Sequence, residues 1–182
     1  MAQVAVHLAT GFEEIEAITV LDVLRRAGIE VFLVSMNKES HVTGTHGITV
    51  LSDRLFEDVD YEQIDMIVLP GGIPGSTNLA VHEGLKQKIS EFAGQGKYLA
   101  AICAAPMVYG QMGLLKGKAA VCFPGCETYL EGAEIAKENV VQAQNFITSK
   151  GPGTALEFSF RLVELLKDAD TAEKLRKDML VL

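Results

Sequence analysis

Short apolar runs alternate along the chain with longer segments of helical periodicity, and these two patterns indicate buried strands and amphipathic helices. The runs that we predict to be strands span residues 4–8, 29–35, 64–69, 97–103, 119–123, 140–144 and 145–149. The segments that we predict to be helices span residues 13–27, 79–93, 107–112, 151–167 and 171–179. Strands that alternate with helices predict an α/β fold, with a mostly parallel sheet covered by helices on both faces.

Local residue types predict where the first helix begins and ends, and they also predict one hairpin. Thr10 and Glu13 have the spacing of a capping box, so we expect the first helix to start there. Gly28 is placed to end that helix at the C′ position. Residues 41–51 contain two short strand-like runs around a glycine-containing turn, which predicts a small hairpin between the main units.

Three turns rich in small residues follow predicted strands, at residues 10–11, 70–72 and 103–104. In parallel sheets, ligands bind outside the carboxyl ends of the strands. We therefore expect these three turns to meet at one edge of the sheet and to form the functional site there.

Cys103 is the residue around which we expect this site to form. It ends an apolar run and precedes small residues, Pro106 and a helical segment, a strand–turn–helix pattern like a nucleophile elbow with a thiol in place of the hydroxyl. A helix N-terminus beside the thiol can lower a cysteine pKa from about 8.5 to roughly 3.5–7.5. The alternative is a buried structural cysteine, because free cysteine is among the most buried residue types.

Glu16 is an acidic residue on the face of the first helix that Val20 and Val23 are expected to bury. Burial in an apolar site raises the pKa of a carboxyl group, and the protonated group can donate a hydrogen bond to a thiolate or to an oxidised sulfur. The alternative is a side chain that reaches solvent or pairs with a basic residue.

Residues 70–72 can present bare backbone N–H groups opposite Cys103, and with the Ala104 N–H these would form an oxyanion-type pocket. The glycines are equally explained by a loop that needs positive φ. Residues 151–154 lack the lysine of a phosphate-binding loop, so we predict a helix start with proline in its first turn.

The remaining cysteines and histidines add one candidate base. Cys122 and Cys126 are not accompanied by paired histidines, so we expect structural roles for them and no metal site. His46 is the histidine that can approach Cys103 as a base, either from the hairpin of the same chain or from a second subunit.

Composition narrows the class of protein. The 182 residues, 48% hydrophobic and 22% charged, suit one domain over residues 1–182. A net charge of −8 argues against a nucleic-acid partner. Residues 98–115 are uncharged, but Pro106 and glycines interrupt them, which argues against a membrane span. Three cysteines and no recognisable signal peptide lead us to expect a cytoplasmic protein.

Four segments, residues 13–16, 68–72, 100–106 and 148–154, resemble the ThiJ/PfpI superfamily in the same order along nearly the whole chain. The branch they resemble contains the Parkinson-disease-associated protein and its bacterial YajL-type relatives. The resemblance implies a flavodoxin-like three-layer sandwich, similar to class I glutamine amidotransferases. It also implies a homodimer without a cofactor.

The same resemblance implies roles for individual residues. Cys103 would be the reactive, easily oxidised cysteine and Glu16 its protonated partner, with backbone N–H donors at Gly72 and Ala104. The charged residues that the family has near its dimer contact would be Asp22 and Arg26.

Three positions depart from the family pattern. Ala104 stands where the protease branch has a histidine, which argues against a peptidase, and Phe123 stands where other members have a histidine near the cysteine. His46 takes the place of the family arginine of the hairpin. Two functions follow: an enzyme acting on reactive dicarbonyls or their early adducts on thiols and amines, or a redox sensor or stress chaperone in which Cys103 becomes sulfinic acid.

Overall fold

The computed structural model describes residues 2–181, and its centre is a seven-stranded sheet of order β10-β11-β7-β6-β1-β2-β5. Neighbouring strands are parallel except β10 and β11, which form an antiparallel edge hairpin. The strands of this sheet are β1 (Gln3–Leu8), β2 (Glu30–Ser35), β5 (Arg54–Leu55), β6 (Met66–Leu69), β7 (Tyr98–Ile102), β10 (Val140–Ala143) and β11 (Phe146–Ser149).

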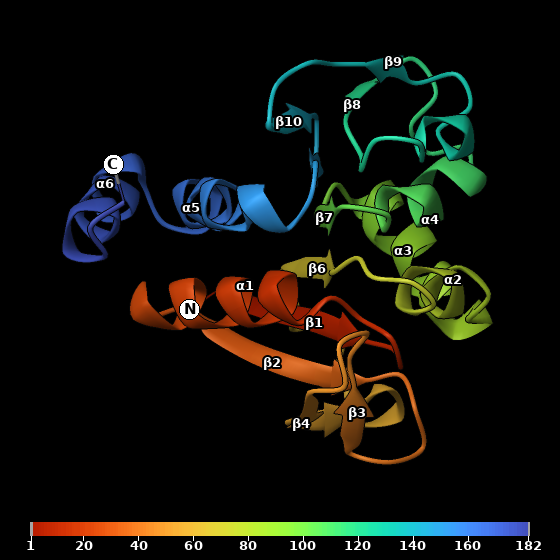
Figure 1. The fold of residues 1–182 in the computed structure, drawn as a ribbon, viewed down its shortest axis with the longest axis horizontal. Coiled ribbons are helices and arrows are strands. Elements are labelled where there is room, and N and C mark those ends of the chain that lie inside the picture. Colours follow the sequence, from red (N-terminus) through yellow and green to blue (C-terminus); the bar gives the residue numbers. More distant parts are fainter. Residues whose placement is uncertain (1, 182) are drawn as a thin grey trace.

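Helices cover both faces of the sheet. One face packs against α1 (Glu14–Arg26), α5 (Ala155–Leu166) and α6 (Ala169–Asp178), and the other against α2 (Gly75–Ala80), α3 (Glu83–Gln95) and α4 (Pro106–Gln111). Figure 1 shows α5 and α6 in blue, separated by the strands from the green group α2, α3 and α4. The expected flavodoxin-like sandwich with a mostly parallel sheet is confirmed.

The side chains of β1 explain the two cores. Val4, Val6 and Leu8 are fully buried in the core under α1 and α5, whereas Ala5 is fully buried in the core under α3 and α4. Successive side chains of a strand point to opposite faces, so a strand covered by helices on both sides is mostly apolar, and the one buried polar side chain of β1, His7, is hydrogen-bonded to Tyr61.

Two small sheets lie outside the main one. The predicted hairpin forms as β3 (His41–Thr43) and β4 (Thr49–Leu51), which pair antiparallel. The other pairs β8 (Ala119–Ala120) with β9 (Glu134–Ile135). Short 3₁₀ turns at Phe56–Asp58, Glu127–Tyr129 and Pro152–Thr154 complete the chain, and the last begins with proline as expected.

The expected capping box at Thr10 and Glu13 is wrong. The Thr10 hydroxyl accepts a hydrogen bond from the Asn37 amide at 3.0 Å, and Glu13 is the N-cap without a side-chain cap. The chain instead bends at Gly11, which has φ +85°, before the helix begins at Glu14. The predicted C-terminal end of this helix is confirmed, because Gly28 follows the C-cap residue Ala27 and has φ +68°.

Two other predicted elements also differ. The helix expected over residues 79–93 is divided into α2 and α3, because His82 caps α3 by accepting a hydrogen bond from the Leu85 N–H at 3.1 Å. The strand expected over residues 119–123 is paired only at β8 and lies outside the main sheet. Among the described residues, none of the helices is long and apolar enough to cross a membrane.

Candidate functional site: the cavity around Cys103

Cys103 lies in the sharp turn between β7 and α4, at the carboxyl edge of the sheet. Its φ is +65°, a left-handed backbone conformation that residues other than glycine rarely adopt. Its N–H donates to the Ser149 carbonyl at 2.9 Å, and its own carbonyl accepts from the Phe123 N–H at 2.8 Å. These bonds hold a backbone conformation that costs free energy, and such residues cluster at functional sites.

Glu16 approaches Cys103 from the first turn of α1 and is fully buried. Its Oε2 accepts a hydrogen bond from the Gly71 N–H at 2.7 Å, and its Oε1 is buried without a hydrogen-bond partner within the described part of the chain. Burial raises the pKa of Glu16 to about 7, against the opposing effects of the Gly71 and Cys103 hydrogen bonds. The carboxyl group is therefore protonated in a large fraction of molecules at neutral pH.

The Cys103 thiol is coupled to this carboxyl group. Burial first, and the charge of Glu16 second, raise the pKa of the thiol to about 12, while the N–H groups of Gly72 and Ala104 act to lower it. The lowered pKa expected from the helix N-terminus is therefore wrong, because burial and the Glu16 charge outweigh the N–H groups. Protonation of Glu16 removes the like-charge repulsion, so the two side chains titrate as a pair.

The glycine turn after β6 contacts both α1 and the thiol. Gly71 uses its N–H for Glu16, which leaves Gly72 as the donor near the sulfur. Gly72 has φ +89°, and a Cβ atom there would lie 2.5 Å from the Gly11 carbonyl oxygen and the Glu13 nitrogen. Positive φ and close packing both require glycine at this position.

A cavity of about 320 Å³ opens in front of the sulfur. The Gly72 and Ala104 turns form one part of its wall, and Phe123 and Cys126 form another. Phe123 is 46% exposed and supplies only an apolar ring near the cysteine. His46 also lines the cavity, so the hairpin of the same chain brings this histidine to the site.

Neither Glu13 nor Glu14 was predicted to be a site residue, and the structure places both beside His46. The His46 Nδ1 lies 2.9 Å from Glu14 Oε2 and 3.6 Å from Glu13 Oε2. The three side chains are close enough to surround a cation, with potential ligand atoms within 4.8 Å of one another. Glu14, however, already accepts from the His46 N–H, the His46 ring and the Ile48 N–H, so we assign no metal to the cluster.

Other residues named from the sequence lie away from the cavity. Asp22 and Arg26 form an exposed ion pair on α1, with Arg26 Nε 2.7 Å from Asp22 Oδ2. Cys122 is buried, and burial raises the pKa of its thiol to about 12. His7 is buried against Tyr61, with 2.8 Å between Nε2 and the phenol oxygen.

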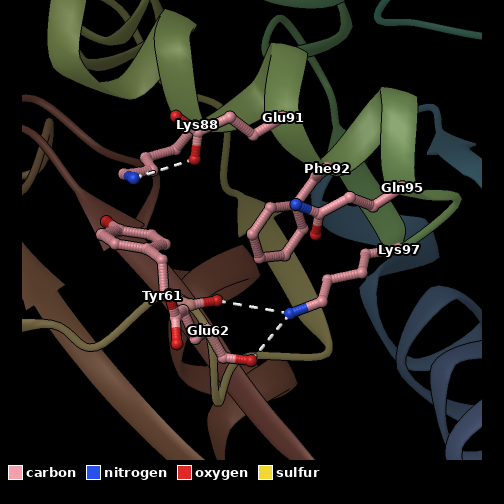
Figure 2. A pocket seen from close by; sticks show the side chains of 7 residues that line it. All are labelled: Tyr61, Glu62, Lys88, Glu91, Phe92, Gln95 and Lys97. Atoms are coloured by element: carbon pink, nitrogen blue, oxygen red, sulfur yellow. Dashed lines mark hydrogen bonds and ion pairs between the residues drawn. The ribbon is translucent and has the colours of Figure 1, made fainter.

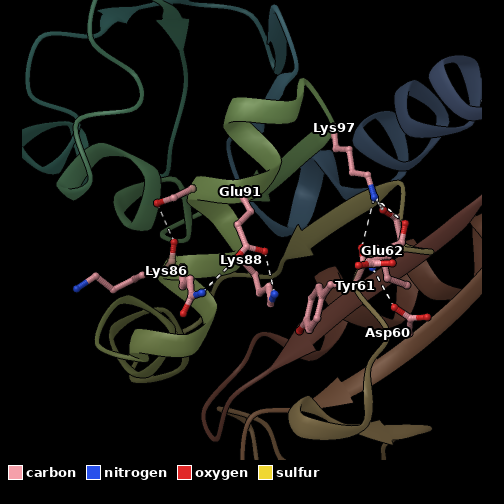
Figure 3. A network of polar contacts seen from close by, with 10 residues as sticks. Asp60, Tyr61, Glu62, Lys86, Lys88, Glu91 and Lys97 are labelled. Atoms are coloured by element: carbon pink, nitrogen blue, oxygen red, sulfur yellow. Dashed lines mark hydrogen bonds and ion pairs between the residues drawn. The ribbon is translucent and has the colours of Figure 1, made fainter.

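A second hollow lies beside α3, and Figure 2 shows that both lysines that line it already have partners. Lys97 Nζ donates to the carbonyls of Glu62 and Ile64 at 2.9 and 2.8 Å. Lys88 pairs with Glu91 at 2.8 Å, within the larger network of polar contacts in Figure 3. Because these charges are paired, we place the functional site at Cys103.

Several known proteins are similar in sequence to most of this chain. Protein DJ-1 homolog B of Arabidopsis thaliana is 38% identical over 172 residues, which are 93% of this chain and 39% of that protein. Glutathione-independent glyoxalase DJR-1.2 of Caenorhabditis elegans is 33% identical over 168 residues, covering 92% of this chain and 89% of the relative. Deglycase PYRAB04690 of Pyrococcus abyssi is 30% identical over 167 residues, covering 91% of this chain and 99% of the relative.

Solved structures share the fold over the whole chain. Oxidized DJ-1 of Toxoplasma gondii superposes with a TM-score of 0.95 at 35% identity, covering 99% of this chain and 98% of that one. The chain spans less than half the length of the Arabidopsis relatives, 39% and 46% of homologs B and A. The family model described as DJ-1/PfpI family matches residues 2–165, and the chain belongs to that family.

Proposed function

We propose that this protein is a cysteine-dependent enzyme of the stress response, acting on small reactive dicarbonyls or their early adducts on thiols and amines. The observation that carries the proposal is the buried pair of Cys103 and Glu16, of which Cys103 lines an open cavity. Relatives named as a glutathione-independent glyoxalase and a deglycase support the same substrate class.

The reaction proceeds from the minor form of the pair in which the proton has moved from the sulfur to Glu16, so that the sulfur is a thiolate. The thiolate attacks the aldehyde carbon, a C–S bond forms, and the carbonyl π electrons move to oxygen. The N–H groups of Gly72 and Ala104, which lie near the sulfur, stabilise the oxyanion that forms. Glu16 then passes its proton to that oxygen, which completes a hemithioacetal.

The test compares two matched cysteine variants with methylglyoxal as substrate. Cys103→Ser removes the nucleophile, whereas Cys122→Ser changes a buried thiol that is absent from the cavity wall. We expect Cys103→Ser to abolish consumption and Cys122→Ser to retain it. Equal consumption by Cys103→Ser and wild type would refute the proposal.

A redox sensor is the second candidate function. Glu16 Oε1 is buried without a partner in the described part of the structure, and a protonated carboxyl could donate to an oxygen on oxidised Cys103. Under this alternative, limiting peroxide converts Cys103 to sulfinic acid before it modifies Cys126, and methylglyoxal turnover is absent. Peptide mass spectrometry after peroxide treatment separates the two functions.

We propose that residues 1–182 form one domain that assembles as a cytoplasmic homodimer. The support is an exposed stripe on α1 in which Ile15 is 57% and Ile18 is 39% exposed. Asp22 and Arg26 continue the same stripe, because positions three and four apart share one helix face. All three cysteines are free, which suits a reducing compartment, and the reaction needs no cofactor.

A further inference from the structure

We propose that His46 is the proton-transfer residue of the Cys103 cavity and that Glu14 is the positioning residue that orients its ring. The inference rests on the proposed dicarbonyl activity. The imidazole of His46 is a base on the wall of the same cavity, whereas the ring of Phe123 is apolar and cannot accept a proton.

The contact between Glu14 and the ring fixes which nitrogen is reactive. An ionised carboxylate only accepts hydrogen bonds, so the Nδ1 atom, 2.9 Å from Glu14 Oε2, is the donor. The Nε2 atom therefore carries the lone pair when the ring is neutral. A carboxylate on one imidazole nitrogen and a reacting group on the other is the arrangement of catalytic triads.

Glu14 is itself held in place, because its side chain is almost completely buried and its Oε1 accepts from two backbone N–H groups of the hairpin turn. These are the N–H of His46 at 2.8 Å and that of Ile48 at 3.3 Å. Although burial acts in the opposite direction, the hydrogen bonds from His46 and Ile48 lower the pKa of Glu14. The carboxylate thus stays charged at neutral pH.

The hairpin that carries His46 is fastened to the cavity at three points. The Gly11 N–H donates to the Thr43 carbonyl and the Thr45 N–H donates to the Phe12 carbonyl, each at 2.8 Å. The Thr45 hydroxyl donates to the Ile73 carbonyl at 3.0 Å. These bonds tie the turn to both loops that border Cys103, so the ring reaches the cavity within one chain.

The reaction has a step that requires such a group. After Cys103 forms the hemithioacetal, neutral Nε2 takes the proton from the former aldehyde carbon, and the C–H electron pair forms the double bond of an enediolate. Protonated His46 returns this proton to the neighbouring carbon, and the hydroxyl proton passes between the two oxygens. The product is a thioester of a 2-hydroxy acid, isomeric with the hemithioacetal. Water then hydrolyses it, releasing the acid and regenerating the thiol.

The charges around the His46 ring determine whether turnover increases or decreases with pH. The Glu14 hydrogen bond and then the charge of Glu13 raise the pKa of His46. Both carboxylates approach from α1, and the titratable groups elsewhere on the wall are Cys103 and Cys126. Because only the neutral ring accepts a proton, turnover should increase as the pH rises through the raised pKa of His46.

The test uses His46→Gln and His46→Arg, with His41→Gln as the control on the same hairpin. Arginine keeps the positive charge beside Glu13 and Glu14 but does not release its proton near neutral pH. General acid–base groups typically contribute about 10²–10⁴-fold. We therefore expect both His46 variants to lower kcat for methylglyoxal at least about 10²-fold with little change in KM. His41→Gln should match wild type.

Two further readouts distinguish proton transfer from a structural role. Mass spectrometry should still detect the methylglyoxal adduct on Cys103 in both His46 variants, and Glu14→Gln should shift the pH profile to lower pH. Wild-type kcat in His46→Arg, with Cys103→Ser inactive, would overturn this inference and leave the proposed function intact. Absence of turnover in wild type would overturn both.

Discussion

Among single residues, the carboxyl group of Glu16 decides the chemistry of the thiol because it has no contact with water. Glu16 is fully buried, and its pKa of about 7 lies well above the ordinary value of 4.5. Sequence periodicity placed Glu16 on a buried face but left open whether its side chain would escape to solvent. The Gly71 N–H, more than fifty residues further along the chain, holds it inside.

Glu16 should make stability decrease as the pH rises. The folded protein holds this proton up to about pH 7, whereas the unfolded chain releases it near pH 4.5. The protonated Glu16 therefore contributes its full share to the free energy of unfolding below pH 4.5. That share, about 3 kcal/mol, is lost by pH 7. Glu16→Gln cannot ionise, so denaturant titrations at pH 4.5 and 7.5 should show its stability relative to wild type increasing with pH. An unchanged difference would contradict a raised pKa.

The same variant should make Cys103 react faster with an alkylating agent. Above pH 8 Glu16 is ionised, and its charge is one of the causes that raise the thiol pKa. Glutamine removes the charge, so a larger fraction of the sulfur is thiolate. We expect iodoacetamide to modify Cys103 several-fold faster in Glu16→Gln at pH 8.5, with Glu127→Gln, a surface change near Cys122, as the control. An equal or slower rate would show that Glu16 does not restrain the thiol.

Among the elements, the strands and helices that carry a clear hydrophobic pattern over many residues could be predicted from the sequence. The elements that were missed have local causes. Burial on both faces makes β6 an uninterrupted apolar run and makes β1 apolar apart from Gln3 and the buried His7. The break between α2 and α3 was missed because His82 acts as a cap through its ring nitrogen, a role that periodicity does not indicate. The edge strand β5 has only two residues and leaves no pattern at all.

The glycine turn after β6 should not tolerate a side chain. Gly72→Ala forces a residue with a Cβ atom into φ +89° and against the backbone of Gly11 and Glu13. We expect a loss of about 2–4 kcal/mol in unfolding free energy. Gly94→Ala is the matched control, because Gly94 is helical and a Cβ atom there meets nothing within 4 Å. The control should be more stable by about 0.5–1 kcal/mol, and similar losses in both would refute the packing argument.

At the scale of the whole molecule, the cavity joins segments that are distant in sequence. The N-terminus of α1, the β3–β4 hairpin, the turn after β6 and the β7–α4 elbow all contribute to its wall. The meeting of the glycine turn with the cysteine elbow could be predicted, because both follow parallel strands. The sequence named His46 as a residue able to approach Cys103 but left open whether it came from the same chain or from a second subunit, since the hairpin lies outside the main sheet and its docking depends on hydrogen bonds to loops.

The proposed dimer makes a prediction about the exposed stripe of α1. Ile18→Glu puts a charge in the middle of the stripe, so we expect it to dissociate the dimer in sedimentation velocity experiments. Val81→Glu is the matched control, because Val81 is 68% exposed and lies between α2 and α3, away from the stripe. If Ile18→Glu sediments like wild type, another surface forms the assembly.

If the proposed function is right, Cys103 turns over a dicarbonyl substrate and is regenerated. The direct measurement gives wild-type protein a hundredfold excess of methylglyoxal, counts the moles of 2-hydroxy acid formed per mole of protein, and then determines the intact mass. We expect many turnovers with Cys103 returned to the free thiol. At most one equivalent of methylglyoxal consumed, with a lasting adduct or oxidised sulfur at Cys103, would contradict it.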